Sequence, residues 1–171
     1  MCSDGACDLH TAKASHGTVY GSSLLQQIIA TAAGPVDGNP SMVTSYRAEL
    51  SGIVAVLYTI YGICHYYHIT SGAMTIYCDN KGALRNAFQT IKPGITPYFQ
   101  TDHDLLEVAQ SLIPLVSITI AAQWVKGHYT GSGRQFQHHL NDKADQVAGD
   151  FQQYQYPHHS IQKPLHPLIL E

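Results

Sequence analysis

Apolar side chains alternate with polar ones in some stretches of the chain and recur with a helical period in others. Between 118 and 124 every second residue is apolar, which is typical of a half-buried β-strand. Between Ile53 and Ile60 the apolar residues recur every three or four positions, which predicts a long helix from Thr44 or Ser45 to about His68. The pattern predicts strands at 1–4, 15–21, 24–33, 73–78 and 118–124, and further helices at 80–89, 98–112 and 139–152.

The order of these segments predicts an α/β fold built as one domain. The strands at 15–21 and 24–33 are separated by Gly and Ser and are expected to pair as a hairpin, whereas the later strands alternate with helices. A hairpin followed by crossovers implies a mixed sheet with helices packed on its faces. We expect the domain to cover residues 1–152. Residues 153–171 carry three Pro and three His, and we expect them to form a poorly ordered tail.

Composition narrows the classes of function that this domain can have. The chain has 171 residues, of which 44% are hydrophobic, so it can bury a sizeable core. Only 12% of the residues are charged, the formal net charge is −3, and no run of Lys or Arg is present. A protein that binds nucleic acid by electrostatics alone is more basic than this. Affinity for nucleic acid would therefore have to come from local positive spots, a bound metal or a tethered partner domain.

The cysteines and the apolar runs indicate where such a protein is found. Cys2, Cys7, Cys64 and Cys78 lack the spacing of a disulfide framework, which predicts reduced thiols and an intracellular, cytoplasmic or nuclear, location rather than secretion. No Cys and His spacing typical of a zinc site is present, which argues against a structural zinc protein. The longest apolar run, Ile53 to Cys64, is too short to span a bilayer, so we expect no membrane association.

Acidic residues on predicted apolar faces are the strongest candidates for chemistry. Glu49 lies within ~40° of Ile53 on a helical wheel, so its carboxylate falls on the buried face of the long helix. In the last helix Asp145 lies at the border of the inner face, about 110° from its centre, whereas Asp142 points to solvent. A buried carboxylate without a partner costs several kcal/mol, so a favourable charge near the helix N-terminus does not by itself explain Glu49.

Two further carboxylates, Asp4 and Asp79, are predicted to end strands, where open α/β sheets place their functional crevice. An ordinary turn role is the alternative for each of them taken alone. Four carboxylates spread over the chain can converge only around cations, and oxygen ligands of this kind suit a pair of divalent ions.

The segments around these acids resemble the ribonuclease H type 1 family. The resemblance rests on the order Asp, Glu, Asp, a Lys-Gly-His loop, and a helix with Asn-x-x-x-Asp, and it covers about residues 1–152. The matching segments are Ser3-Asp4-Gly5-Ala6, Tyr46-Arg47-Ala48-Glu49-Leu50, Tyr77-Cys78-Asp79-Asn80, Trp124-Val125-Lys126-Gly127-His128 and Asn141-Asp142-Lys143-Ala144-Asp145. A transposase-type acidic triad on a similar fold would place its Glu last, on the final helix, which this chain does not do.

The resemblance implies a fold and an activity. The fold would be a five-stranded mixed sheet flanked by helices, with its first strand truncated because only three residues precede Asp4. The activity would be hydrolysis of the RNA strand of RNA–DNA hybrids with two Mg²⁺ ions, or Mn²⁺. Asp4 would bridge both ions, Glu49 and Asp79 would bind one, and Asp145 the other. His128 would assist proton transfer or product departure, since the pKa of a histidine is ordinarily near 6.5.

Substrate contacts and partners follow from the same resemblance. The Gly5 backbone, Ser45, Tyr46 and Asn80 would contact the 2′-hydroxyl of the RNA strand, and Thr44 a phosphate of the DNA strand; Ser45 has an N-cap role as its alternative. The domain would be covalently linked to a reverse transcriptase of a retroelement. The competing hypothesis is a catalytically silent remnant that keeps the fold and acts as a nucleic-acid-binding or scaffold module.

Overall fold

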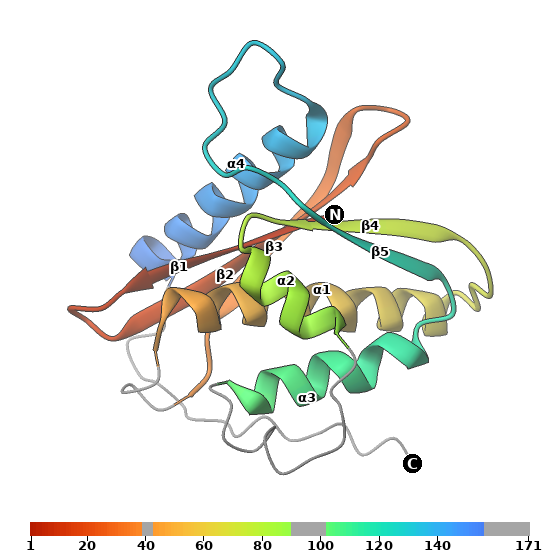
Figure 1. Cartoon of the computed structure of the whole chain (residues 1–171), viewed down its shortest axis with the longest axis horizontal. Coiled ribbons are helices and arrows are strands. Elements are labelled where there is room, and N and C mark those ends of the chain that lie inside the picture. The colour runs from red at the N-terminus through yellow and green to blue at the C-terminus, as the bar shows by residue number, and fades with distance from the viewer. Residues whose placement is uncertain (39–42, 90–101, 156–171) are drawn as a thin grey trace.

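A five-stranded sheet with helices on both faces forms the framework of the protein (Figure 1). The computed structural model describes residues 1–38, 43–89 and 102–155. Within them the elements are β1 (Cys2–Asp8), β2 (Lys13–Ser22), β3 (Gln27–Pro35), α1 (Ser45–Tyr66), β4 (Ala73–Cys78), α2 (Lys81–Phe88), α3 (His103–Leu112), η3 (Ile113–Leu115), β5 (Thr119–Trp124), α4 (Phe136–Asp150) and η4 (Phe151–Gln155).

The strand order β3-β2-β1-β4-β5 confirms the predicted mixed sheet. β1, β2 and β3 form an antiparallel meander, with Asp4 opposite Gly17 and Asp8 opposite Lys13. β4 and β5 run parallel over their whole length. β1 joins the two halves, but it pairs with β4 at one position only, Cys2 beside Tyr77. The centre of the sheet is therefore held by a short contact between its two halves.

The helices form one layer on each face of the sheet. α1, α2 and α3 contact one another on one face, and α4 packs against β1 and β2 on the other (Figure 1). The larger apolar cluster lies on the α1 side and includes Leu50, Ile53 and Leu57 of α1 with Ile76 of β4. A smaller cluster on the α4 side includes Cys2, Val19 and Leu140. Although α1 is long and apolar enough to cross a membrane, 56% of that stretch is buried inside the protein, as in a core helix.

Most predicted elements are confirmed, and one prediction about the first strand is wrong. The strand predicted at 73–78 matches β4, and the four cysteines are free thiols. β1, however, continues to Asp8, so Asp4 lies inside a strand and does not end it. Pairing with β2 explains the extension, because every residue from Cys2 to Asp8 has a partner there. The helix predicted at 139–152 begins at Phe136, while residues 98–101 and 156–171 lie outside the described residues.

Glycines in the first two strands let both helix layers approach the sheet closely. A Cβ on Gly5 would lie 2.6 Å from the Ala48 carbonyl carbon and from the Glu49 nitrogen of α1. A Cβ on Gly17 would overlap the Ala144 carbonyl oxygen and lie 2.7 Å from the Ala148 nitrogen of α4. Since these neighbours are backbone atoms, neither helix can yield without moving as a whole. Glycine at 5 and 17 thus sets the distance of α1 and α4 from the sheet.

We predict that Gly17→Ala destabilises the protein by about 1–3 kcal/mol, because the added methyl group forces α4 away from β2. Urea unfolding followed by circular dichroism measures the change. The matched control is Gly62→Ala in α1, where among the described residues no atom lies within 4 Å of the added Cβ. That control should be stabilised by about 0.5–1 kcal/mol, as for alanine replacing glycine inside a helix. Equal stability of the two variants would contradict the close-approach role of Gly17.

Candidate active site

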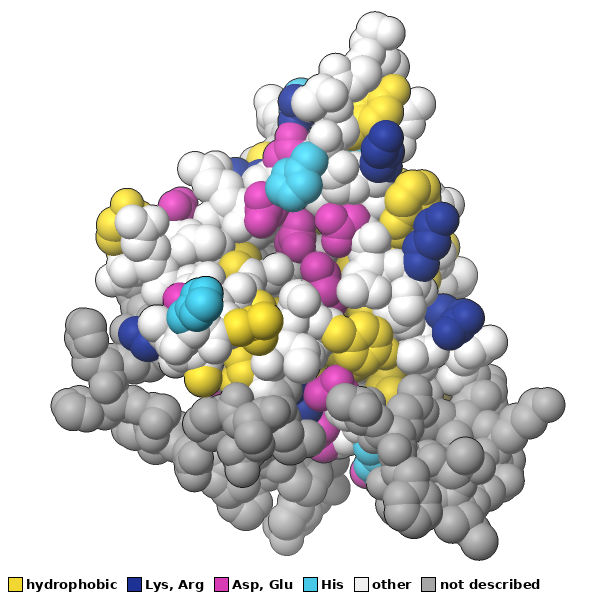
Figure 2. Space-filling model, turned by 60° about the vertical axis from the view of Figure 1, so that its left-hand side comes forward, with side chains coloured by type: hydrophobic (Ala, Val, Ile, Leu, Met, Phe, Trp, Pro, Cys, Tyr) yellow, Lys and Arg dark blue, Asp and Glu magenta, His cyan; other side chains and the backbone are white. Residues whose placement is uncertain are grey.

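Carboxylates from three separate elements meet where β1 and β4 diverge. Asp4 comes from β1, Glu49 from the first turns of α1, and Asp79 directly follows the last residue of β4. Asp4 is 5% exposed and Glu49 is 6% exposed, so the burial predicted for Glu49 from its helical position is confirmed. Figure 2 shows acidic side chains gathered on one face of the molecule, with a histidine beside them.

The meeting of Asp4 and Glu49 depends on the glycine that follows Asp4. Because α1 lies against Gly5, the backbone of Ala48 and Glu49 passes directly over β1. The side chain of Glu49 is thereby held next to the carboxyl of Asp4, whose charge raises the pKa of Glu49. Any side chain at position 5 would separate the two carboxyl groups. Contact between the Gly5 backbone and a substrate stays a prediction. The structural role of Gly5 is to let α1 approach β1.

Asp4 is fixed by contacts on both of its oxygens. The Gly5 N–H donates to Oδ1 at 2.7 Å, and the Asn141 side-chain amide of α4 donates to Oδ2 at 3.3 Å. Asn141 is itself buried and accepts a hydrogen bond from the Cys2 thiol at 3.3 Å. The side chain of Asp4 therefore has a single orientation, set by β1 and α4 together.

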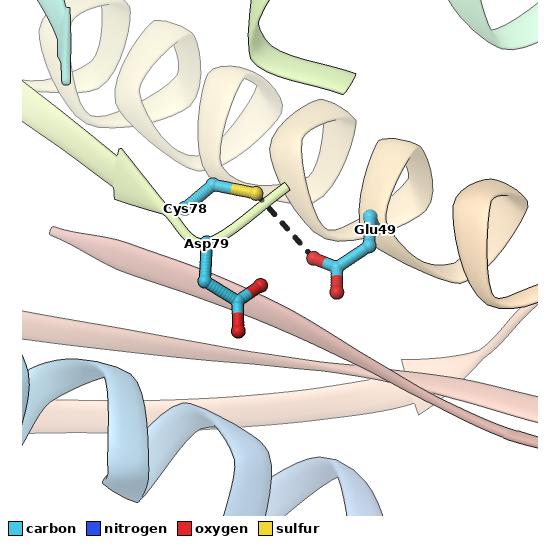
Figure 3. A group of neighbouring side chains, drawn as sticks. All are labelled: Glu49, Cys78 and Asp79. Carbon is cyan, nitrogen blue, oxygen red and sulfur yellow. Dashed lines mark hydrogen bonds between the residues drawn. The ribbon is translucent and has the colours of Figure 1, made fainter. Parts of the chain in front are cut away.

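Glu49 and Asp79 approach each other across Cys78 (Figure 3). The Cys78 thiol donates to Glu49 Oε2 at 3.4 Å. One ligand atom each from Glu49, Cys78 and Asp79 lies within 4.8 Å of the others, which is close enough for the three residues to share one metal ion. The backbone of Asp79 is held by Trp124 of β5, because the Trp124 indole N–H donates to the Asp79 carbonyl at 2.8 Å.

Burial and the charges of neighbouring carboxylates raise the pKa values of the two inner carboxyl groups, Asp4 and Glu49. Burial, followed by the charge of Asp79, raises the pKa of Asp4 to about 7. Burial, followed by the charges of Asp4 and Asp79, raises the pKa of Glu49 further. No ion pair formed by the described residues involves Asp4, Glu49 or Asp79. The site has an excess of negative charge that a proton or a bound cation has to offset.

Arg47 is the nearest buried cation along the chain, and its guanidinium is used elsewhere. Its Nη1 donates to Asp102 and to Asp104, each at 2.9 Å, and its Nη2 donates to Asp104 at 2.6 Å. Its Nε donates to the backbone carbonyl of Asp37 at 2.9 Å. These contacts tie the start of α3 to the start of α1. Arg47 therefore supports the position of Glu49 without neutralising it.

Asp145 and His128 lie at the rim of the acidic group. Asp145 extends from α4 with 45% of its side chain exposed, and its charge contributes to the raised pKa of Asp4. The His128 Nδ1 lies 3.9 Å from Asp145 Oδ2, and His128 is 79% exposed in a left-handed backbone conformation (φ 47°). Gly127 packs against the carboxylate of Asp79, where a side chain would overlap it. Asp142 instead pairs with Arg134.

Four of the residues predicted to contact substrate lie at the N-termini of α1 and α2, next to the acidic residues. Thr44 is the N-cap of α1 and accepts from the Arg47 N–H at 3.0 Å, so the alternative N-cap role considered for Ser45 is wrong. Ser45 is exposed at the first helical position, and the Tyr46 hydroxyl accepts from Asn86 at 2.7 Å. Asn80 caps α2 by accepting from the Ala83 N–H at 3.0 Å. Ser45 is thus the member of this group whose side chain is most accessible to a ligand.

Cys78 and Asn141 contact the acids directly, and neither was among the candidate residues. Cys78 gives no signal in the sequence, because a cysteine ending an apolar strand is typical of a core residue. Asn141 was detectable, since it precedes Asp145 by one helical turn and lies within ~20° of the inner residue Ala148 on a helical wheel. An amide on an apolar helix face needs a buried partner, and that partner is Asp4.

The side chains that could bind a metal here suit hard divalent cations, except for the thiol of Cys78. Carboxylate oxygens of Asp4, Glu49, Asp79 and Asp145 are the ligands that Mg²⁺ and Mn²⁺ prefer. The Cys78 sulfur is a softer donor, and burial raises the pKa of its thiol. The protonated thiol serves as a hydrogen-bond donor to Glu49 rather than as a competing ligand.

Comparisons with known proteins identify the fold. No protein-family model and no curated protein matches the sequence. Among solved structures, the N-terminal RNase H domain of a Mycobacterium tuberculosis protein is similar to this chain, with a TM-score of 0.55, 18% identity, and coverage of 88% of this chain and 90% of that one. RNase H1 of the archaeon Halobacterium salinarum gives a TM-score of 0.53 at 16% identity, covering 87% and 92%.

A third structure, LC11-RNase H1 in complex with an RNA/DNA hybrid, gives a TM-score of 0.53 at 10% identity, covering 87% of this chain and 92% of that one. The chain therefore has the RNase H-like fold, and the predicted fold class is confirmed.

We predict that the metal-free protein loses stability as the pH rises. Asp4 keeps its proton in the folded state up to about pH 7, whereas the unfolded chain releases it near pH 4. The folded state therefore binds more protons between these values, and its stability falls across that window. At pH 8 Glu49 is ionised in the unfolded chain and has to take up a proton on folding, because its pKa is raised in the folded state. Glu49→Gln removes this cost and should raise the free energy of unfolding at pH 8 by about 1–3 kcal/mol in EDTA.

Urea unfolding at several pH values measures this effect. Asp142→Asn is the matched control, because Asp142 forms a half-exposed ion pair with Arg134 and should change stability by less than about 1 kcal/mol. A Glu49→Gln variant whose stability at pH 8 equals that of the parent protein would contradict the repulsion described above.

Proposed function

We propose that this chain is a metal-dependent endoribonuclease that hydrolyses the RNA strand of RNA–DNA hybrids. The observation that carries the proposal is the convergence of Asp4, Glu49 and Asp79, two of them buried with raised pKa values, with Asp145 at the rim. A protein gains no stability from such a group of like charges, so a binding or catalytic role explains it better. The RNase H-like fold supports the choice of nucleic acid as substrate.

The proposed cofactors are two Mg²⁺ ions, with Mn²⁺ as a substitute, held by Asp4, Glu49, Asp79 and Asp145. When bound, such ions offset the charge of the phosphodiester and lower the pKa of the attacking water. The protein contributes orientation: Gly5 and Asn141 hold the Asp4 carboxylate, and Trp124 anchors the backbone of Asp79. Burial on both helix layers limits the access of bulk water to Asp4 and Glu49.

His128 is proposed to move a proton at the open side of the site. It is exposed, it follows Gly127, and its Nδ1 lies 3.9 Å from the Asp145 carboxylate. An exposed side chain in a loop can reach a substrate oxygen and then withdraw. Asp145 would orient the ring as well as bind metal.

Binding of a polyanion by a chain of net charge −3 requires local positive groups. Lys81 lies 4.1 Å from the centroid of the Trp124 ring, and Lys126 lies 5.9 Å from that of Tyr129. These cation and aromatic pairs border the acids and suit contact with phosphates and bases. Thr44, Ser45, Tyr46, Gly5 and Asn80 remain proposed contacts with the hybrid.

The low basic content also supports the proposal that the domain works while covalently linked to a reverse transcriptase domain, which would supply affinity for the hybrid. Unpaired cysteines agree with an intracellular location.

A catalytically silent remnant is the second candidate for the function of this chain. It is favoured by the single-position pairing of β1 with β4, close to Asp4.

We expect the purified protein to cleave the RNA strand of an end-labelled hybrid with Mg²⁺ and to lose this activity in EDTA. Asp79→Asn should reduce cleavage at least about 100-fold, because it removes a metal ligand without leaving a cavity. Asp142→Asn should retain activity. Absence of cleavage by the parent protein, together with normal folding, would favour the silent remnant, and cleavage by Asp79→Asn at the parent rate would exclude the proposed site.

We expect His128→Ala to lower kcat by roughly 100-fold without lowering stability, since the side chain is exposed and acts only in proton transfer. His10→Ala, at an exposed turn away from the acids, is the control and should keep the parent kcat. A parent-like kcat in His128→Ala would remove His128 from the mechanism.

A further inference from the structure

The loop that joins β5 to α4, residues 125–135, borders the acidic group at two neighbouring positions. A Cβ on Gly127 would overlap Oδ2 of Asp79, so the loop backbone lies against that carboxylate. The next residue, His128, brings its Nδ1 to 3.9 Å from Asp145 Oδ2. One loop thus touches acids from two separate elements. The position of the His128 ring therefore depends on how this loop is held.

The backbone of His128 adopts a conformation that it would not keep by itself. Its φ of 47° lies in the left-handed region. A residue with a Cβ is uncommon there and stays only where its surroundings fix the conformation. The His128 side chain is 79% exposed, so packing of its own ring does little to fix it. The conformation must therefore be fixed by its neighbours in the loop, Gly127 and Tyr129.

Tyr129 is contacted from several sides, in contrast to His128. Its ring stacks on the His138 imidazole of α4, with the ring centroids 4.4 Å apart and the planes 22° apart. The Lys126 Nζ lies 5.9 Å from the centroid of the same ring. A Cβ on Gly131 would lie 2.5 Å from the Tyr129 hydroxyl, so the loop backbone closes against that end of the side chain. The Tyr129 side chain is thereby held between α4 and its own loop.

His138 gives this stack a fixed base. Its Nδ1 accepts a hydrogen bond from the Gln135 N–H at 2.9 Å, as part of the capping box that begins α4. The first turn of the helix thus fixes the imidazole ring. Asp145 lies about two turns further along the same helix. Tyr129 therefore connects the loop that carries His128 to the helix that carries Asp145.

We infer that Tyr129 is a positioning residue, which holds His128 in its left-handed conformation beside Asp145 through the stack on His138. The inference rests on the proposed role of His128 in proton transfer. Since Tyr129 directly follows His128, fixing its ring fixes the peptide group between the two residues. The imidazole of His128 stays free to turn about its own side-chain bonds, but it meets a substrate oxygen from a set direction.

Three substitutions remove this anchor in different ways. Tyr129→Ala removes the ring, and Gly131→Ala places a methyl group where the Tyr129 hydroxyl now lies. His138→Gln keeps an acceptor for the Gln135 N–H but removes the imidazole from the stack. The matched controls are Tyr129→Phe, which keeps the stack, and Gly133→Ala, whose Cβ would make an ordinary contact at 3.5 Å from the same hydroxyl.

Backbone order parameters from NMR relaxation, measured without metal or hybrid, report on the anchor directly. We expect the value at His128 to be about 0.85 in the parent protein and in both controls, and below about 0.6 in the three anchor variants. Circular dichroism should show an intact fold in all of them. An unchanged order parameter at His128 in Tyr129→Ala would overturn the inference, whether or not the protein cleaves hybrids.

Cleavage of an RNA–DNA hybrid then separates positioning from contact with substrate. The anchor variants should lower kcat about 10-fold and leave KM unchanged, because the Tyr129 ring acts through His128. In a His128→Ala background Tyr129→Ala should cause no further loss, since the group that it positions is gone.

Two kinetic results would show that Tyr129 contacts substrate and would overturn the inference. One is a rise in KM with kcat unchanged, and the other is a further loss of about 10-fold in the His128→Ala background. A parent protein in which Tyr129 orders His128 as expected, but which cleaves no hybrid, would support the anchor and contradict the proposed function.

Discussion

The site depends on one close contact, the packing of α1 on β1 at Gly5. Because no side chain separates the two elements there, the backbone of Glu49 lies over the strand that carries Asp4, and the two carboxyl groups are buried together. Burial of like charges is unfavourable, and it persists only because the surrounding packing holds both elements in place. The raised pKa values of Asp4 and Glu49 are direct consequences of this contact.

Packing on the other face completes the constraint. α4 approaches β2 at Gly17 in the same way that α1 approaches β1 at Gly5, and this brings Asn141 to Asp4 and Asp145 to the rim. Cys78 donates to Glu49 from the end of β4, and Arg47 is held by Asp102 and Asp104. Each inner carboxyl group thus receives hydrogen bonds but no compensating charge. A divalent cation would offset the negative charge of the acids and remove the repulsion among them.

Local patterns predicted much of this arrangement, and non-local contacts explain the rest. The position of Glu49 on the helical wheel was enough to predict its burial, and alternation was enough to place β4 and β5. The extent of β1 was not predictable, because Gly5 and Asp8 are poor strand residues and the strand is specified by its pairing with β2. The start of α4 at Phe136 depends on a capping box between Gln135 and His138, in which histidine replaces the usual acidic or amide residue. The contacts of Cys78 and Asn141 appear only when three elements are assembled.

The most direct test of this account is calorimetric titration of Mg²⁺ or Mn²⁺ into the protein near pH 7 in buffers of different ionisation enthalpy. If the cation displaces a proton from Asp4 or Glu49, the heat should depend on the buffer and indicate release of about one proton on binding. Glu49→Gln should bind more weakly and release fewer protons. Binding without proton release, or no binding at millimolar cation by the folded protein, would contradict the claim that these buried carboxyl groups form a metal site.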